Sequence, residues 1–109
     1  MTTLSTHVLD TALGQPAQGV PVQLTRLTPA VLVLGSGTTD QDGRIGSLTA
    51  KELTAGTYQL RFDTAAYARA TEQEIFFPEV TVTFLISDER HYHVPLLLSP
   101  FAFSTYRGS

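Results

Sequence analysis

Residues 56–74, GTYQLRFDTAAYARATEQE, contain both kinds of regular structure that we expect in this chain. In the first half, GTYQLRFD, every second residue from Tyr58 to Phe62 is apolar, which is typical of a half-buried β-strand. The second half, DTAAYARATEQE, is rich in alanine and begins with two residues, Asp63 and Thr64, that can cap a helix. This half therefore predicts one short helix of about two turns.

Outside this stretch, alternation of apolar and polar residues predicts strands almost throughout the chain. With residues 56–63 they make eight strands, and the other seven are expected at 4–10, 20–27, 30–40, directly after the Asp-Gly-Arg turn at 42–44, and at 76–87, 90–99 and 101–107. Eight short strands and a single helix predict an all-β sandwich. We expect one domain over residues 1–109, because no repeat, low-complexity segment or linker divides the chain.

The composition excludes several classes of function. The 109 residues carry a net charge of -3, which provides no basic surface for nucleic acid or anionic lipid. The chain has no cysteine, so it contains no disulfide, thiolate nucleophile or cysteine-ligated metal. Residues 1–10, MTTLSTHVLD, lack the basic and apolar regions of a signal peptide, and no run approaches the roughly 20 apolar residues of a membrane span. We expect a soluble, cytoplasmic protein.

The three histidines are the first candidates for a functional site. In an extended strand His91 and His93 share one face while Tyr92 points to the other. A His-x-His pair can aim two nitrogens at one metal ion, and His7 could complete a three-histidine zinc site. The same spacing also fits acid-base catalysis or ordinary histidines on a solvated strand face. Spacing alone leaves these three interpretations open.

Several segments together resemble the transthyretin-related family, and specifically its 5-hydroxyisourate hydrolases of urate degradation. They are LSTHVLDTALGQPAQGVPVQL, the DGR turn, GTYQLRFD and HYHVPLLLSPFAFSTYRGS, so the resemblance runs over residues 4–109. Transthyretin, the hormone carrier, shares the order of elements and the LLSP segment but lacks the histidines and the YRGS ending. The resemblance implies two four-stranded sheets with one short helix, assembled as a homotetramer with active sites between dimers.

The resemblance also implies roles for eight residues. The catalytic set is His7, Arg44, His93 and Ser109, and the substrate-binding set is His91, Tyr106, Arg107 and Gly108. The implied reaction is hydrolysis of 5-hydroxyisourate to 2-oxo-4-hydroxy-4-carboxy-5-ureidoimidazoline without a metal or organic cofactor. A neutral histidine, His7 or His93, would act as general base, while Arg44 or Arg107 would offset charge on the carbonyl oxygen. The alternative is a transthyretin-like protein that holds a small ligand without chemistry.

Overall fold

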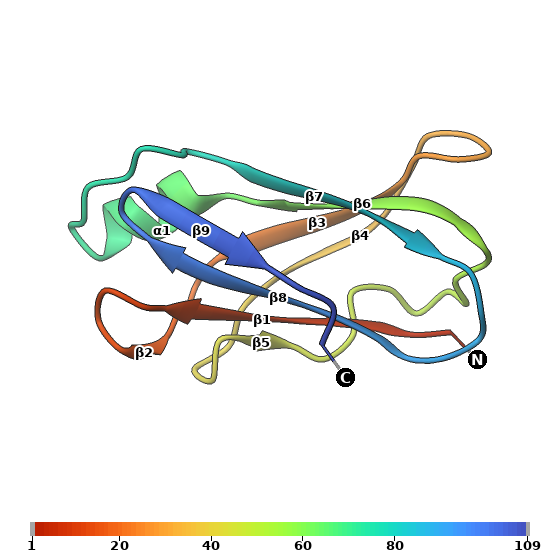
Figure 1. The fold of residues 1–109 in the computed structure, drawn as a ribbon, viewed down its shortest axis with the longest axis horizontal. Coiled ribbons are helices and arrows are strands. Elements are labelled where there is room, and N and C mark those ends of the chain that lie inside the picture. The colour runs from red at the N-terminus through yellow and green to blue at the C-terminus, as the bar shows by residue number, and fades with distance from the viewer. Residues whose placement is uncertain (1, 109) are drawn as a thin grey trace.

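Two β-sheets packed face to face, with one short helix at one end, make up the computed structural model, which describes residues 2–108 (Figure 1). The five-stranded sheet contains β1 (Leu4–Asp10), β2 (Gln15–Pro16), β5 (Arg44–Ile45), β8 (Tyr92–Ser99) and β9 (Ala102–Thr105). The four-stranded sheet contains β3 (Pro21–Arg26), β4 (Leu32–Thr38), β6 (Gly56–Phe62) and β7 (Val80–Ile86). The all-β sandwich predicted from the sequence is confirmed.

Several boundaries differ from the sequence prediction, since β4, β7 and β8 are shorter than the strands expected at 30–40, 76–87 and 90–99. Residues Gln15–Pro16, expected in a loop, form the short strand β2 against the end of β1. The last strand, expected at 101–107, is limited to Ala102–Thr105. Helix α1 spans Thr64–Ala70, about two turns as predicted, and it ends before Glu72, whose φ of 54° cannot continue a right-handed helix.

The core fills the space between the sheets mainly with alternate residues of β1, β3, β6 and β8. In β8, Tyr92, Val94, Leu96 and Leu98 are buried, whereas His93 is only half-buried on the opposite face. The same alternation in β1 separates its buried residues from those on the outer face. Because a slip of one residue would turn each strand over, burial of this apolar set fixes the register. The alternation therefore directs polar side chains of both strands to the outer face.

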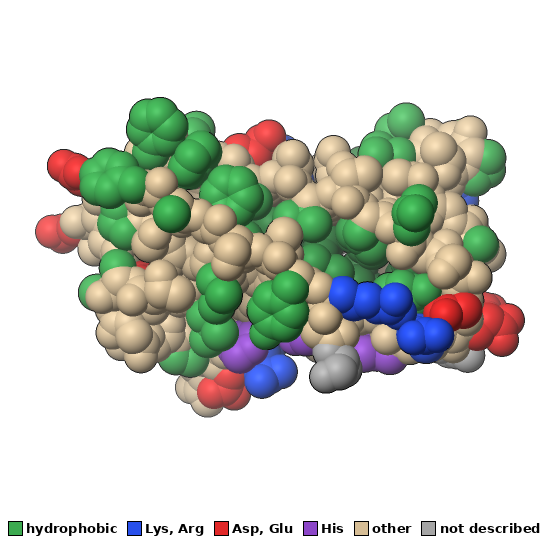
Figure 2. Space-filling model, viewed as in Figure 1, with side chains coloured by type: hydrophobic (Ala, Val, Ile, Leu, Met, Phe, Trp, Pro, Cys, Tyr) green, Lys and Arg blue, Asp and Glu red, His purple; other side chains and the backbone are tan. Residues whose placement is uncertain are grey.

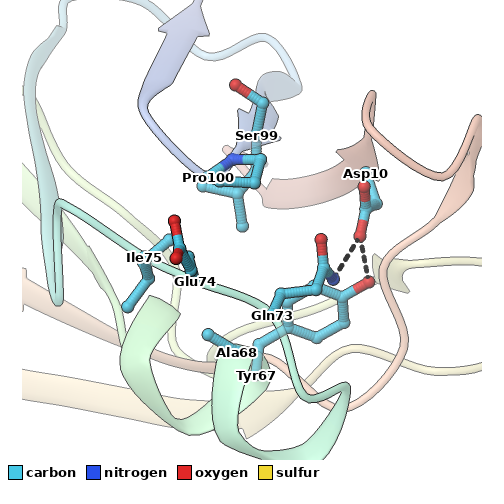
Figure 3. A pocket seen from close by; sticks show the side chains of 9 residues that line it. Asp10, Tyr67, Ala68, Gln73, Glu74, Ile75, Ser99 and Pro100 are labelled. Atoms are coloured by element: carbon cyan, nitrogen blue, oxygen red, sulfur yellow. Dashed lines mark hydrogen bonds between the residues drawn. The ribbon is translucent and has the colours of Figure 1, made fainter.

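Helix α1 is joined to the end of β1 through a buried carboxylate. Asp10 is only 2% exposed. Its Oδ2 accepts hydrogen bonds from the Tyr67 hydroxyl at 2.6 Å and from Nε2 of Gln73 at 3.0 Å, and its Oδ1 accepts the Leu13 N–H at 2.9 Å (Figure 3). A buried charge is tolerated when several donors replace its hydration.

No helix within residues 2–108 is long and apolar enough to cross a membrane.

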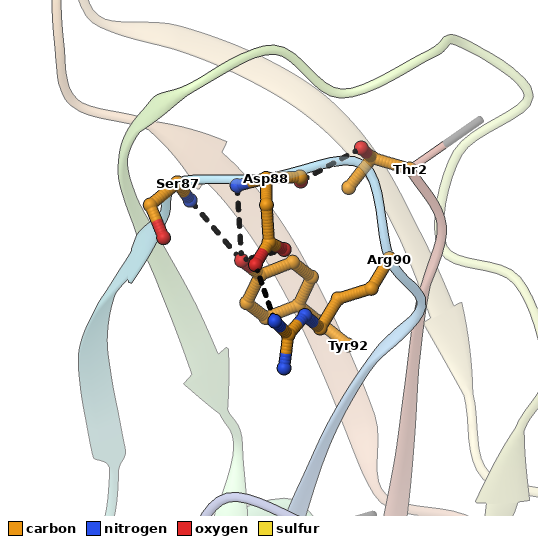
Figure 4. Close-up of polar contacts among 5 residues, drawn as sticks. All are labelled: Thr2, Ser87, Asp88, Arg90 and Tyr92. Atoms are coloured by element: carbon orange, nitrogen blue, oxygen red, sulfur yellow. Dashed lines mark hydrogen bonds and ion pairs between the residues drawn. The ribbon is translucent and has the colours of Figure 1, made fainter.

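The loop that precedes β8 is fixed by Tyr92 (Figure 4). The Tyr92 hydroxyl donates to Oδ1 of Asp88 at 2.8 Å and accepts the Ser87 N–H at 3.1 Å. Arg90 pairs with the other oxygen of Asp88 at 2.7 Å, and the Thr2 hydroxyl donates to the Asp88 carbonyl oxygen at 3.1 Å. These contacts join the start of the chain to the loop that carries His91.

Replacing Tyr67 with phenylalanine tests the buried carboxylate, because it removes one donor to Asp10 and retains the ring. We expect the free energy of unfolding at pH 7 to fall by about 1–2 kcal/mol. The measurement is urea denaturation at a fixed protein concentration. The matched control is Tyr106→Phe, at a side chain that is 56% exposed. The control should change the free energy by less than about 0.5 kcal/mol, and equal losses in both variants would contradict the account.

The same carboxylate predicts a dependence of stability on pH. Burial alone would raise the pKa of Asp10, but hydrogen bonds from Tyr67, Gln73 and backbone N–H groups hold it below its ordinary value. A carboxyl with a lowered pKa in the folded state contributes stability above its unfolded pKa and loses it as the pH falls through the folded pKa. The difference between wild type and Tyr67→Phe should therefore shrink below about pH 4. An undiminished difference at pH 2 would contradict this assignment.

Candidate active site

A hollow of about 460 Å³ lies on the outer face of the five-stranded sheet, opposite the core. The residues that line it are Ser5, His7, Arg44, His91, His93, Tyr106 and Gly108. Figure 2 shows histidines along one edge of this view with basic side chains beside them. Among residues 2–108, no acidic side chain lines the hollow. The hollow is therefore a polar site with imidazole and guanidinium groups as its chemistry.

Strand pairing brings these residues together from distant parts of the sequence. Strands β1 and β8 are parallel, and their register places Ser5 opposite His93. On the other edge of β1, the short antiparallel strand β5 places Arg44 opposite His7. The ring centroids of His7 and His93 are 6.5 Å apart. The two histidines suggested as general bases therefore lie in one site.

Hydroxyl groups from the start of the chain hold the His-x-His pair. The Ser5 Oγ lies 2.7 Å from Nδ1 of His93 and 2.8 Å from Nε2 of His91. The remaining nitrogen of His91, Nδ1, is hydrogen-bonded to the Thr3 hydroxyl. Within residues 2–108, Nε2 of His93 has no hydrogen-bond partner. His93 is thus oriented through one nitrogen and retains the other for a molecule in the hollow.

Gly108 lies directly against the His93 ring. Its N–H donates to the His93 carbonyl oxygen at 2.8 Å, as an isolated bridge beyond the end of β9. A Cβ atom at this position would lie 2.6 Å from Cδ2 of His93, which is closer than real Cβ contacts allow. Glycine is therefore the residue that permits the segment after β9 to pack against the imidazole.

Burial lowers the pKa of His93, and the nearby charge of Arg44 lowers it further, with smaller contributions from His7 and His91. These effects disfavour the imidazolium ion. The lowered pKa favours the neutral imidazole of His93, the form that can accept a proton.

Two residues expected in the site lie elsewhere or outside the described chain. The Arg107 guanidinium carbon sits 4.7 Å from the centroid of the Tyr92 ring, a cation–π contact. Arg107 lines a separate, mostly apolar groove of about 280 Å³ beside β7, together with Val82 and Phe84. Ser109 lies outside residues 2–108, so its position is not described. The other six expected residues line the hollow.

Sequence reasoning missed Ser5. The sequence did carry a signal for it, because residues two apart in a strand lie on the same face, and Ser5 and His7 are two apart in LSTHVLD.

The three-histidine zinc interpretation gains no support, because within residues 2–108 no group of three or more His, Cys, Asp or Glu side chains is arranged to hold a metal ion.

Removing the positive charge of Arg44 should raise the pKa of His93. We expect this direction in Arg44→Ala because a neighbouring cation disfavours the imidazolium. NMR titration of protein labelled at its three histidines measures the shift. Arg69→Ala, which removes a cation from the last turn of α1, is the control and should leave the titration of His93 unchanged. An unchanged pKa in Arg44→Ala would contradict the proposed electrostatics.

The sequence of this chain is similar to those of known proteins. Residues 4–108 match the model of the HIUase/Transthyretin family. The chain is 49% identical over 111 residues to a 5-hydroxyisourate hydrolase of Mus musculus, with 97% of this chain and 94% of the relative covered.

Solved structures of this family have a similar fold. The Klebsiella pneumoniae 5-hydroxyisourate hydrolase has a TM-score of 0.89 and 40% identity, with 100% of this chain and 94% of that chain covered. Sea bream transthyretin in complex with thyroxine has a TM-score of 0.90 and 33% identity, with 97% of this chain and 94% of that chain covered.

Proposed function

Because this chain belongs to the HIUase/Transthyretin family, we propose that it is a 5-hydroxyisourate hydrolase of urate degradation, a single hydrolase domain over residues 1–109. The observation that carries the proposal is that His93 and Arg44 line the same polar hollow, with Nε2 of His93 lacking a partner among the described residues. This arrangement supplies the two groups that hydrolysis of a cyclic amide requires. They are a proton acceptor for water and a cation for the carbonyl oxygen.

The reaction begins when a water molecule in the hollow gives a proton to a neutral histidine, His93 or His7. The water oxygen forms a bond to the amide carbonyl carbon of the six-membered ring, and the carbonyl oxygen becomes an oxyanion. The C–N bond of the ring then breaks, and its nitrogen takes the proton back from the imidazolium. The product is 2-oxo-4-hydroxy-4-carboxy-5-ureidoimidazoline, and the histidine returns to its neutral form.

Arg44 is the proposed partner of the oxyanion, because its permanent charge lies in the hollow beside His7. Tyr106, Arg107 and Gly108 are proposed to bind the substrate, with His91 in a supporting role, and Ser109 to assist at the reacting atoms. The contact between Gly108 and the His93 ring supports a position of this C-terminal segment beside the bound substrate. Arg107 would have to leave the Tyr92 ring to reach the hollow.

We further propose a homotetramer in the cytoplasm, with each site at an interface between dimers. Large apolar side chains at the sheet edges support association, since Leu85 of β7 is 70% exposed and Phe103 of β9 is 40% exposed. Covering the hollow by a second copy would exclude bulk water and strengthen the electrostatic contacts inside it.

A carrier function is the second candidate, favoured by the likeness to the thyroxine-bound transthyretin of sea bream. The two candidates differ in the site they need. A carrier of an aromatic ligand would use an apolar surface, such as the groove beside β7. A hydrolase would use the hollow of imidazole and guanidinium groups.

Turnover of 5-hydroxyisourate tests the proposal directly. The compound is generated from urate by urate oxidase, and the decay of its ultraviolet absorbance is followed with and without this protein. We expect wild type to accelerate the decay and His93→Ala to lose about 100-fold or more of kcat, as for removal of a general base. Glu89→Ala, at an exposed loop residue outside the hollow, is the control. Decay at the uncatalysed rate with folded wild type would reject the hydrolase.

The pH profile tests the protonation state of the base. A neutral imidazole is required, and the pKa of His93 is lowered by burial and by Arg44, with His7 and His91 also facing the ring. The kcat should therefore be level near pH 7 and fall only as the pH drops below about 6.5, the ordinary histidine value. Preformed substrate is mixed with enzyme at each pH. A rise in kcat toward acid would contradict a neutral histidine base.

A further inference from the structure

The Ser5 hydroxyl occupies an unusual position between two imidazole rings. Its Oγ lies 2.7 Å from Nδ1 of His93 and 2.8 Å from Nε2 of His91, both within hydrogen-bond distance. The Thr3 hydroxyl closes the outer end of this row through Nδ1 of His91. The row Thr3–His91–Ser5–His93 therefore runs along the outer face of the paired β1 and β8.

The number of protons limits how this row can be arranged. A serine hydroxyl has one proton to donate, and a neutral imidazole has one donor nitrogen and one acceptor nitrogen. With both rings neutral, Ser5 can donate to at most one ring, and it accepts from any ring to which it does not donate. In one arrangement Ser5 donates to Nδ1 of His93, and the ring proton sits on Nε2. In the other arrangement Nδ1–H of His93 donates to Ser5, and Nε2 carries a lone pair.

The charges in the hollow favour the second arrangement. Arg44 lines the same hollow as His93, and its positive charge is better matched by a lone pair on the exposed nitrogen than by an N–H. The rest of the row can follow this arrangement, because Nε2 of His91 can accept the proton of the Ser5 hydroxyl and Nδ1–H of His91 can donate to the Thr3 hydroxyl. Every member of the row then has a partner of the right kind.

We propose that Ser5 is a positioning residue that holds His93 as the Nδ1–H tautomer, so that Nε2 is the proton acceptor in the hollow. The inference rests on the proposed hydrolase function, and it selects His93 rather than His7 as the base. Ser5 does not touch the reacting atoms and acts only through His93. When Nε2 takes a proton from water, Nδ1–H keeps its bond to Ser5, so the ring need not reorient during the reaction.

The tautomer of His93 can be measured without substrate. Protein labelled with ¹⁵N at its three histidines is examined by NMR at a pH where His93 is neutral, since the two ring nitrogens differ in shift according to which one carries the proton. We expect Nδ1–H in wild type and in Ser5→Thr, which keeps a hydroxyl. In Ser5→Ala the population should move toward Nε2–H. An Nε2–H ring in wild type, or an unchanged tautomer in Ser5→Ala, would overturn the proposal.

Kinetics of the same variants separate positioning from substrate binding. Ser5→Ala should lower kcat about tenfold, the effect of losing one good hydrogen bond, with KM changed less than about twofold. Ser5→Thr should restore most of kcat. Ser36→Ala on β4 removes a strand serine from the other sheet and should behave as wild type. A rise in KM with kcat unchanged, or a kcat that Ser5→Thr does not restore, would overturn the positioning role.

The two readouts also distinguish this inference from the proposed function. Absence of turnover in wild type would reject the hydrolase, whereas the NMR result would still decide whether Ser5 fixes the tautomer. Full turnover in wild type together with an Nε2–H ring would leave the hydrolase intact and reject the role of Ser5. Thermal unfolding of each variant checks that a change in the His93 signals is not loss of the fold.

Discussion

The parallel pairing of β1 with β8 is the constraint on which the site depends. It joins residues near the start of the sequence to residues near its end, with Leu4 opposite Tyr92 and Asp10 opposite Leu98. One consequence is that Ser5 faces the His93 position, and another is that β5 can add Arg44 to the free edge of β1 beside His7. A shift of one residue would turn the histidines toward the core, so the apolar face of each strand also specifies the chemistry on the other face.

Contacts at the two ends of this pair limit its movement. At one end the buried Asp10 carboxylate binds side chains that follow β6, and at the other Tyr92 binds the loop before β8. A site built on paired strands and held at both ends keeps its hydrogen-bond distances more closely than a site on loops would. That matters for a row of hydroxyls and imidazoles, in which a small displacement would break the orientation of His93.

The sequence predicted the sandwich, its helix and the shared face of His91 and His93, because each follows from local composition or periodicity. It did not predict β2, whose two residues form a strand only because the end of β1 offers a partner. The position of Arg107 over Tyr92 depends on a ring from another strand, and the role of Ser5 depends on the β1–β8 register. Both are non-local, and a single serine carries no motif. The resemblance to a family pointed to the other candidate residues that line the hollow, but it gave no information on the hydrogen bonds among them.

The central claim is that the hollow beside β1, β5 and β8 binds a small oxidised purine between His93 and Arg44. A crystal structure of the wild-type protein soaked with urate, a stable relative of the substrate, tests it most directly. The account predicts urate in the hollow, with a ring oxygen or nitrogen within hydrogen-bond distance of Nε2 of His93 and an oxygen facing Arg44. Urate in the apolar groove beside β7, or an empty hollow at saturating urate, would contradict it.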